Sequence, residues 1–156
     1  MARDHTYNVT VTWTGNRGKG TRHYRDYGRE HEISCPGKPV IQGSADPAYL
    51  GDSVRHNPED LLVAALSACH MLWYLHLCTT AGVVVTAYED TADGTMRTQA
   101  DGSGEFTEVT LRPRVTLGGG SDGALAERLH ETANEMCFIA RSVNFPVTHV
   151  PEIVIE

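Results

Sequence analysis

The sequence has few cysteines and no apolar N-terminal segment. Its four cysteines, Cys35, Cys69, Cys78 and Cys137, are too few and too widely spaced for the disulfide framework of a small secreted protein. The first eight residues lack the apolar stretch of a secretory signal, so we expect a cytoplasmic protein with mostly reduced thiols. Any cysteine pair that does form is then expected to be catalytic or redox-sensing.

Positive charge is also scarce. Lys and Arg number 13 against 20 Asp and Glu, which gives a formal net charge of -7. A phosphate backbone would be repelled on average, so we expect no nucleic-acid partner, although a local basic loop lies between Arg17 and Arg29. Within that loop, Gly15 to Gly20 matches neither a dinucleotide fingerprint nor a P-loop and is interpreted as a hairpin turn.

One stretch, residues 61 to 81, contains no Asp, Glu, Lys or Arg and is long enough to cross a membrane. It carries polar residues such as Ser67, His70 and His76, and no Lys/Arg cluster flanks it. We therefore expect a buried central helix and no membrane partner.

Hydrophobic patterning and turn residues divide the chain into strands and two helices. Asn57 and Pro58 are typical of a helix start, and Gly82 of a helix end. The pattern predicts a single α+β domain over residues 1 to 156, with two helices packed against antiparallel sheets. The expected elements are an N-terminal meander at 5–35 that includes a strand around 20–27, a central helix at 57–81, strands at 83–117, a second helix at 122–141 and a final strand at 150–155.

The spacing of the cysteines limits how they can pair. Cys69 and Cys78 lie about 13 Å apart along the central helix and on opposite sides of it, so they cannot form a disulfide with each other. Cys137, on the second helix, is free to approach Cys69 if the two helices pack together. By residue type alone, a buried inert thiol remains the alternative for Cys69.

The segment from Asn57 to Cys69 resembles the N-P-E-x-L-x-x-A-x-x-[SA]-x-C signature of the OsmC/Ohr superfamily, the osmotically inducible and organic hydroperoxide resistance proteins. Cys137, 68 residues after Cys69, resembles the second cysteine of that family in its spacing. The resemblance implies an OsmC-like fold, with antiparallel sheets wrapped around two central helices in an intertwined homodimer and the active site at the dimer interface.

The resemblance also implies a thiol peroxidase that reduces organic hydroperoxides. Cys69 resembles the peroxidatic cysteine, Cys137 the resolving cysteine and Glu59 the carboxylate that orients an arginine. A guanidinium next to Cys69 would favour the thiolate, which is the attacking species. No cofactor or metal is implied; a dithiol, of lipoyl type or on a lipoylated protein, would reduce the enzyme.

Glu59 and the arginine are placed by the same resemblance. About 15 Å of ideal helix separates Glu59 from Cys69, so we expect Glu59 to serve the Cys69 of the opposite subunit. The family's arginine lies in the N-terminal sheet or in an early turn. Arg29 fits best, and the alternatives are Arg17, Arg25 and Arg55.

The helix next to Cys69 is bulkier and richer in histidine than the family pattern, which leaves the roles of His70, His76 and Trp73 open. One alternative is a non-catalytic protein on the same fold that binds a small apolar ligand near Met71, Trp73 and Tyr74. Another is a metal-dependent hydrolase that uses His70, His76 or His130.

Overall fold

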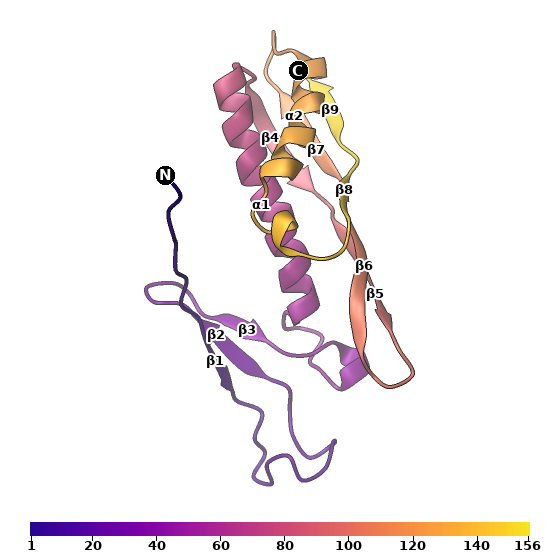
Figure 1. Cartoon of the computed structure of the whole chain (residues 1–156). Coiled ribbons are helices and arrows are strands. Elements are labelled where there is room, and N and C mark those ends of the chain that lie inside the picture. The colour runs from indigo at the N-terminus through magenta and orange to yellow at the C-terminus, as the bar shows by residue number, and fades with distance from the viewer. The chain divides into compact units, whose positions relative to one another are not determined.

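The computed structural model describes residues 1–156, which divide into two compact units, Met1–Leu61 and Leu62–Glu156. A single domain over the whole chain stays a prediction. Figure 1 shows the order of the helices and strands along the chain. Their bounds are β1 (Thr10–Trp13), β2 (His31–Ser34), β3 (Ile41–Gly43), α1 (Pro58–Ala81), β4 (Val85–Asp90), β5 (Asp93–Thr98), β6 (Gly104–Leu111), β7 (Pro113–Leu117), α2 (Gly123–Met136), β8 (Val147–His149) and β9 (Glu152–Ile155), with short 3-10 helices at Pro47–Tyr49 and Ala140–Ser142.

The first unit contains one antiparallel sheet in the order β1-β2-β3. Strand β1 pairs directly with β2, so the strand expected around residues 20–27 was wrong. That stretch has no apolar alternation, and it belongs to a loop that is closed at its base by the 2.8 Å hydrogen bond from Gly28 N to Gly15 O. Within the meander expected at 5–35, the first strand begins only at Thr10, because the chain before Thr10 has no neighbouring strand to pair with.

Two glycines make this closure sterically possible. A Cβ atom on Gly15 would collide with the Gly28 carbonyl, and one on Gly28 would collide with the Glu30 carboxylate. The indole N–H of Trp13 donates to the same Gly28 carbonyl at 2.8 Å. The loop therefore holds the segment that leads into Arg29 against β1.

No apolar side chain of the first unit is buried; all the buried apolar side chains lie between Leu66 and Cys137. Tyr7, Val11 and Trp13 are all exposed, as are Val40 and Ile41. Because hydrophobic burial is the main favourable term in folding, this unit lacks a core of its own.

Helix α1 begins and ends as the sequence predicts. Asn57 Oδ1 accepts a hydrogen bond from Asp60 N at 2.8 Å, and Gly82 ends the helix with a φ of 74°. Its length and apolar composition would suffice to cross a membrane. Every fourth residue from Leu66 to Cys78 is buried, so one face of the helix points into the protein.

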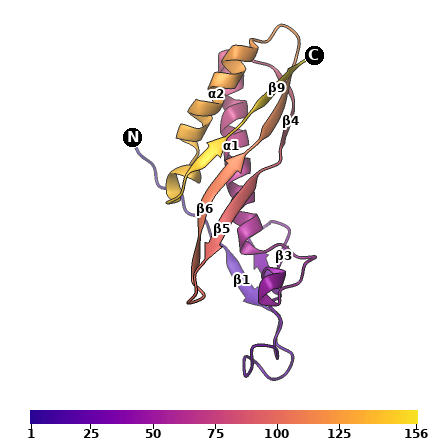
Figure 2. The ribbon, with the colours of Figure 1, turned by 90° about the vertical axis from the view of Figure 1, so that its right-hand side faces the viewer.

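The second unit contains two mixed sheets, β4-β7-β9 and β5-β6-β8. Figures 1 and 2 show these strands on one side of α1, with α2 beside that helix. The expectation of purely antiparallel sheets was wrong, because β7 pairs with β9 and β6 with β8 in parallel. The chain between β7 and β9 includes α2 and β8, and a long crossover that contains a helix is what parallel neighbours require.

The region expected as strands at 83–117 contains four strands, β4 to β7. At Arg112 the chain passes from β6, in the sheet β5-β6-β8, to β7, in the sheet β4-β7-β9. Pro113 opens β7, the central strand of its sheet. Proline is tolerated at the first residue of a strand. The final strand, expected at 150–155, covers Glu152–Ile155.

Helix α2 is shorter than the predicted 122–141. Asp122 caps its start by accepting from Leu125 N, and it ends at Met136 because Cys137 has an extended backbone with a ψ of 114°. The Ala140 N–H, which a continuing helix would direct to the Met136 carbonyl, instead donates to the Cys137 sulfur at 3.4 Å. Cys137 therefore follows the last turn of α2 instead of lying within it.

Candidate functional site

The second unit brings Cys69 and Cys137 together. Cys69 is half-buried on α1, Cys137 is buried at the end of α2, and both are free thiols. The Cys69 thiol is a close enough neighbour to help raise the pKa of the Cys137 thiol. Two sulfurs that are 68 residues apart in the sequence are thus neighbours.

The surroundings of Cys137 favour its neutral form. Burial raises the pKa of the Cys137 thiol to about 11, the Ala140 N–H opposes this shift, and the contact with Cys69 adds to it. At neutral pH Cys137 is therefore protonated. A protonated thiol next to a second cysteine is suited to act after that cysteine has reacted, because it brings its own proton to the condensation step.

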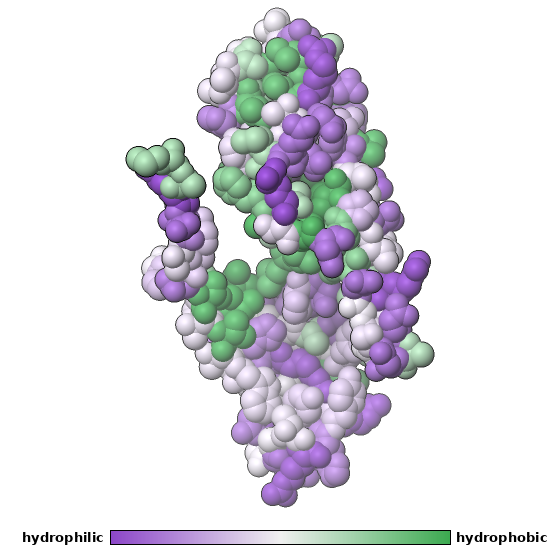
Figure 3. Space-filling model, viewed as in Figure 1, coloured by the Kyte–Doolittle hydropathy of each residue, from purple (hydrophilic) through white to green (hydrophobic).

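An apolar pocket of about 340 Å³ is lined by Leu72, Trp73, His76 and Phe138, which follow the two cysteines closely in sequence. Trp73 is one helical turn after Cys69, and Phe138 directly follows Cys137. The Trp73 and Phe138 rings meet edge to face, with centroids 5.5 Å apart. Leu72 and Phe138 are more than 60% exposed, and Figure 3 shows apolar residues on the surface of this unit.

A second cluster lies behind the thiols, in the core between α1 and α2. His70 and His130 are fully buried, and His70 Nε2 lies 3.0 Å from His130 Nδ1. The Tyr74 ring stacks on His130 at 3.8 Å, and the ring of His149 lies 5.6 Å from that of His70. No spacing in the sequence signalled this cluster, because its members come from α1, α2 and β8.

Burial keeps both histidines of this pair neutral. It lowers the pKa of His70 to about 4, with a smaller contribution from His149. It lowers the pKa of His130 to about 3, with smaller contributions from His70 and His149. A buried ring cannot hold a charge at low cost, so one hydrogen bond between neutral rings joins the helices at neutral pH.

The first unit contains its own pocket, of about 370 Å³. Arg29 and Glu59 both line it, which brings together the two charged residues that the sequence singled out. Its other walls are mostly aromatic or acidic, and include Trp13, Tyr27, His31, Asp46 and Tyr49.

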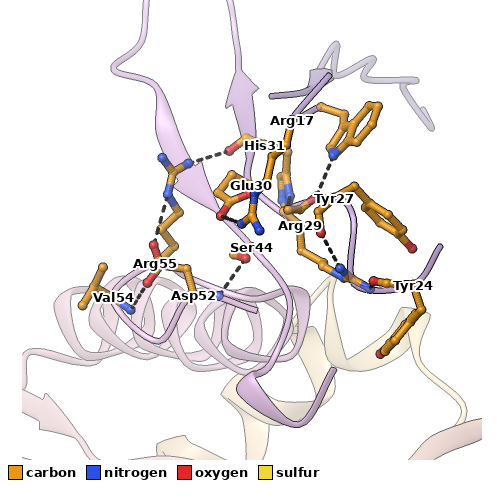
Figure 4. Close-up of polar contacts among 12 residues, drawn as sticks. Arg17, Tyr24, Tyr27, Arg29, Glu30, His31, Ser44, Asp52, Val54 and Arg55 are labelled. Atoms are coloured by element: carbon orange, nitrogen blue, oxygen red, sulfur yellow. Dashed lines mark hydrogen bonds and ion pairs between the residues drawn. The ribbon is translucent and has the colours of Figure 1, made fainter. Parts of the chain in front are cut away.

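The guanidinium of Arg29 is held between two tyrosines (Figure 4). It donates to the carbonyls of Tyr27 and Tyr24, and lies 4.0 Å from the Tyr27 ring centroid and 4.4 Å from that of Tyr24. Arg29 itself precedes β2 instead of lying within a strand. Its position is thus fixed by the loop that Gly15 and Gly28 close.

The other candidate arginines differ in their contacts. Arg17 forms an ion pair with Glu30 at 3.6 Å and Arg55 with Asp52 at 3.8 Å, as Figure 4 shows. Arg25 is exposed. Among the four arginines, Arg29 alone lines the pocket that contains Glu59.

The residues named for the two alternatives, an apolar-ligand binder and a metal-dependent hydrolase, do not come together in one site. Trp73 lines the apolar pocket, whereas Tyr74 is buried and donates its hydroxyl hydrogen bond to Ala126 O. His76 is exposed, and His70 and His130 bind each other. No group of three or more His, Cys, Asp or Glu side chains is arranged to hold a metal ion.

Comparison with known proteins supports the sequence resemblance. The OsmC-like protein family matches residues 51–151. Similar solved structures include an OsmC-like protein of unknown function from Vibrio cholerae, which is 33% identical, with a TM-score of 0.83 over 95% of this chain and 99% of that one. No curated protein matches.

Two more distant structures are named for organic hydroperoxide resistance. One, from Legionella pneumophila, is 16% identical with a TM-score of 0.69, and covers 98% of this chain and 99% of its own. The other, OhrB of Bacillus subtilis, is 19% identical with a TM-score of 0.64, and covers 96% of this chain and 98% of its own. At these identities the likeness concerns the fold, in which α1 is the core helix and not a membrane span.

Proposed function

Because the chain belongs to the OsmC-like family, we propose that it is a thiol-dependent peroxidase that reduces organic hydroperoxides to alcohols. The observation that carries this proposal is the contact between the Cys69 and Cys137 thiols. A buried, protonated thiol beside a more accessible one is the arrangement that a reactive and a resolving cysteine need.

The reaction follows from this arrangement. The thiolate of Cys69 attacks the outer peroxide oxygen, the O–O bond breaks, and the alkoxide leaves with a proton as the alcohol, while Cys69 becomes a sulfenic acid. Cys137 then forms an S–S bond with Cys69, and the sulfenic hydroxyl leaves with the Cys137 proton as water. An external dithiol, which we propose to be of lipoyl type, reduces the disulfide and restores both thiols.

The apolar pocket gives the organic part of the substrate a place next to the sulfurs. Leu72, Trp73 and Phe138 provide surface that apolar chains or rings would cover, which favours organic peroxides over hydrogen peroxide.

Activation of Cys69 is assigned to Arg29, oriented by Glu59, in a homodimer. Two observations support a dimer: the two residues share a pocket in the first unit, and that unit has no buried apolar side chain. A partner subunit would cover the exposed apolar residues, and would present its Arg29 and Glu59 to Cys69. We also propose a cytoplasmic location, in which a dithiol pool keeps the enzyme reduced.

The proposal is tested by turnover of cumene hydroperoxide with a dithiol reductant. Cys69→Ser should reduce turnover to the uncatalysed rate, since a hydroxyl cannot replace the thiolate. Cys137→Ser should react once with peroxide and then accumulate over-oxidised Cys69. Cys35→Ser, which changes a thiol outside the pair, should retain wild-type turnover. Unchanged activity in Cys69→Ser would refute the assignment.

The apolar pocket also favours a second candidate, a non-catalytic protein that binds a small apolar ligand. Its aromatic walls and 340 Å³ volume suit such a ligand with or without chemistry at the thiols. Reduced wild-type protein that does not consume peroxide, but binds an apolar fluorophore that Trp73→Ala no longer binds, would support this second function.

A further inference from the structure

Polar contacts between α1 and α2 follow a regular order along the two helices. The Tyr74 hydroxyl donates to Ala126 O at 3.0 Å, and one turn away His70 Nε2 lies 3.0 Å from His130 Nδ1. Residue numbers decrease along α1 as they increase along α2, so the two helices run antiparallel, and each contact lies one helical turn from its neighbour.

The thiol pair lies beyond the histidine contact, toward the end of α2. Cys69 directly precedes His70 on α1, and Cys137 follows His130 by seven residues, just after α2 ends at Met136. The histidine bond is thus the specific side-chain contact between the helices that lies nearest to the sulfurs in sequence.

We propose that the hydrogen bond between His70 and His130 positions Cys69 against Cys137 for disulfide formation. This assignment rests on the proposed function, because it concerns the step in which the two sulfurs join. His70 and His130 are positioning residues: they act on the reaction through the placement of the helices that carry the thiols.

The directionality of the bond is the physical basis of this role. Apolar side chains tolerate small slides of one helix along another, whereas a bond of 3.0 Å between two ring nitrogens requires one register. A slide of α1 by one residue is a shift of about 1.5 Å, which would break a bond of this length and change the separation of the two sulfurs. Disulfide formation is sensitive to such shifts, because the permitted separations and dihedral angles are narrow.

The histidine pair also stabilises the folded state less than apolar side chains at the same two positions would. With one hydrogen bond between them, the two rings leave His70 Nδ1 and His130 Nε2 buried without a partner. Unpaired buried polar atoms destabilise the folded state, so leucine or phenylalanine would pack this site at lower cost. The cost is explained if the directed bond serves the thiols.

The neutral state of both rings keeps the bond intact over the working pH range. Burial lowers both pKa values, to about 4 and about 3, so one nitrogen donates and the other accepts at neutral pH. The other groups near the pair are the His149 ring, which contacts Glu131 at 3.4 Å, and the Tyr74 ring.

The test is a redox titration of the Cys69–Cys137 disulfide against a reference dithiol. His130→Leu should make the disulfide at least about tenfold less favourable, equivalent to about 30 mV. His130→Asn should restore it to within about threefold of wild type, since an Asn amide occupies the position of Nδ1 and can bind His70 again.

Tyr74→Phe is the matched control. It removes the hydrogen bond to Ala126 one turn away, but keeps the ring that stacks on His130. It should lower stability and leave the disulfide equilibrium unchanged. If Tyr74→Phe and His130→Leu shift that equilibrium equally, or if His130→Leu has no effect, the pair is merely structural and the proposal is overturned.

Two further results, a variant that does not fold and a wild type that forms no disulfide, are interpreted separately. If His130→Leu does not fold, His130→Asn is compared with His130→Gln, whose amide reaches the position of Nε2, away from His70; equal equilibria for the two would overturn the proposal. If the wild type forms no Cys69–Cys137 disulfide after peroxide treatment, the proposed function itself fails, whatever the histidine variants do.

Discussion

Neighbouring side chains on α1 differ in how deeply they are buried. Cys69 is half-buried, while its neighbour His70 is fully buried and bonded to His130. Because successive helical residues lie about 100° apart, these two neighbours lie on different faces of one helix, one half-exposed and one in the core. In the proposed mechanism, the histidine on the core face positions the thiol on the other face.

The buried histidine pair makes stability depend on pH. The folded pKa values of His70 and His130 lie below the ordinary 6.5, so below pH 6.5 the unfolded chain binds more protons than the folded one. The stability is fully present above pH 6.5 and is lost as pH falls toward 4. Between pH 7 and pH 5.5 the free energy of unfolding should decrease by about 2 kcal/mol from this pair.

Urea unfolding measured at several pH values checks this expectation. His130→Asn removes one titrating group and should make the loss at acid pH about half as steep. A wild-type stability that is constant or increases from pH 7 to pH 5.5 would contradict the neutral, buried state of the pair.

At the scale of elements, the start of α1 was predictable because its signals are local. Asn57, Pro58 and Gly82 act through backbone geometry within a few residues, and the structure places all three as expected. The end of α2 was not predictable. Neither glycine nor proline stops it; the helix ends where the Cys137 sulfur takes the Ala140 N–H, which depends on tertiary packing.

The cap of α1 gives a direct test at this scale. Asn57→Ala removes the acceptor of the Asp60 N–H and should lower the free energy of unfolding by about 1 kcal/mol. Asn57→Asp keeps an acceptor at the same position and should stay close to wild type. Both are measured by urea unfolding at pH 7.5, and equal stability of the alanine and wild-type proteins would show that the cap contributes nothing.

For the whole molecule, the proposed dimer predicts complementation between inactive variants. If Glu59 of one subunit serves Cys69 of the other, a Cys69→Ser subunit paired with a Glu59→Gln subunit leaves one site with both native residues. Random mixing makes half of the dimers mixed, so about a quarter of the wild-type sites should return.

Peroxidase turnover after the two variants are unfolded and refolded together measures this recovery. Each variant refolded alone is the control. Mixed dimers that regain no activity would contradict a site shared between subunits, while a protein of 17.1 kDa in light scattering would contradict the dimer itself.

The sequence by itself determined the helix that carries Cys69, the cap that starts it and the family, because helix signals and the family signature are read along a contiguous stretch. Only the tertiary structure decided that Arg29 and Glu59 share a pocket, that His70 meets His130, and that the second unit's sheets contain parallel strands. Those features join residues from distant segments, and long-range contacts depend on how elements pack, which no local pattern encodes.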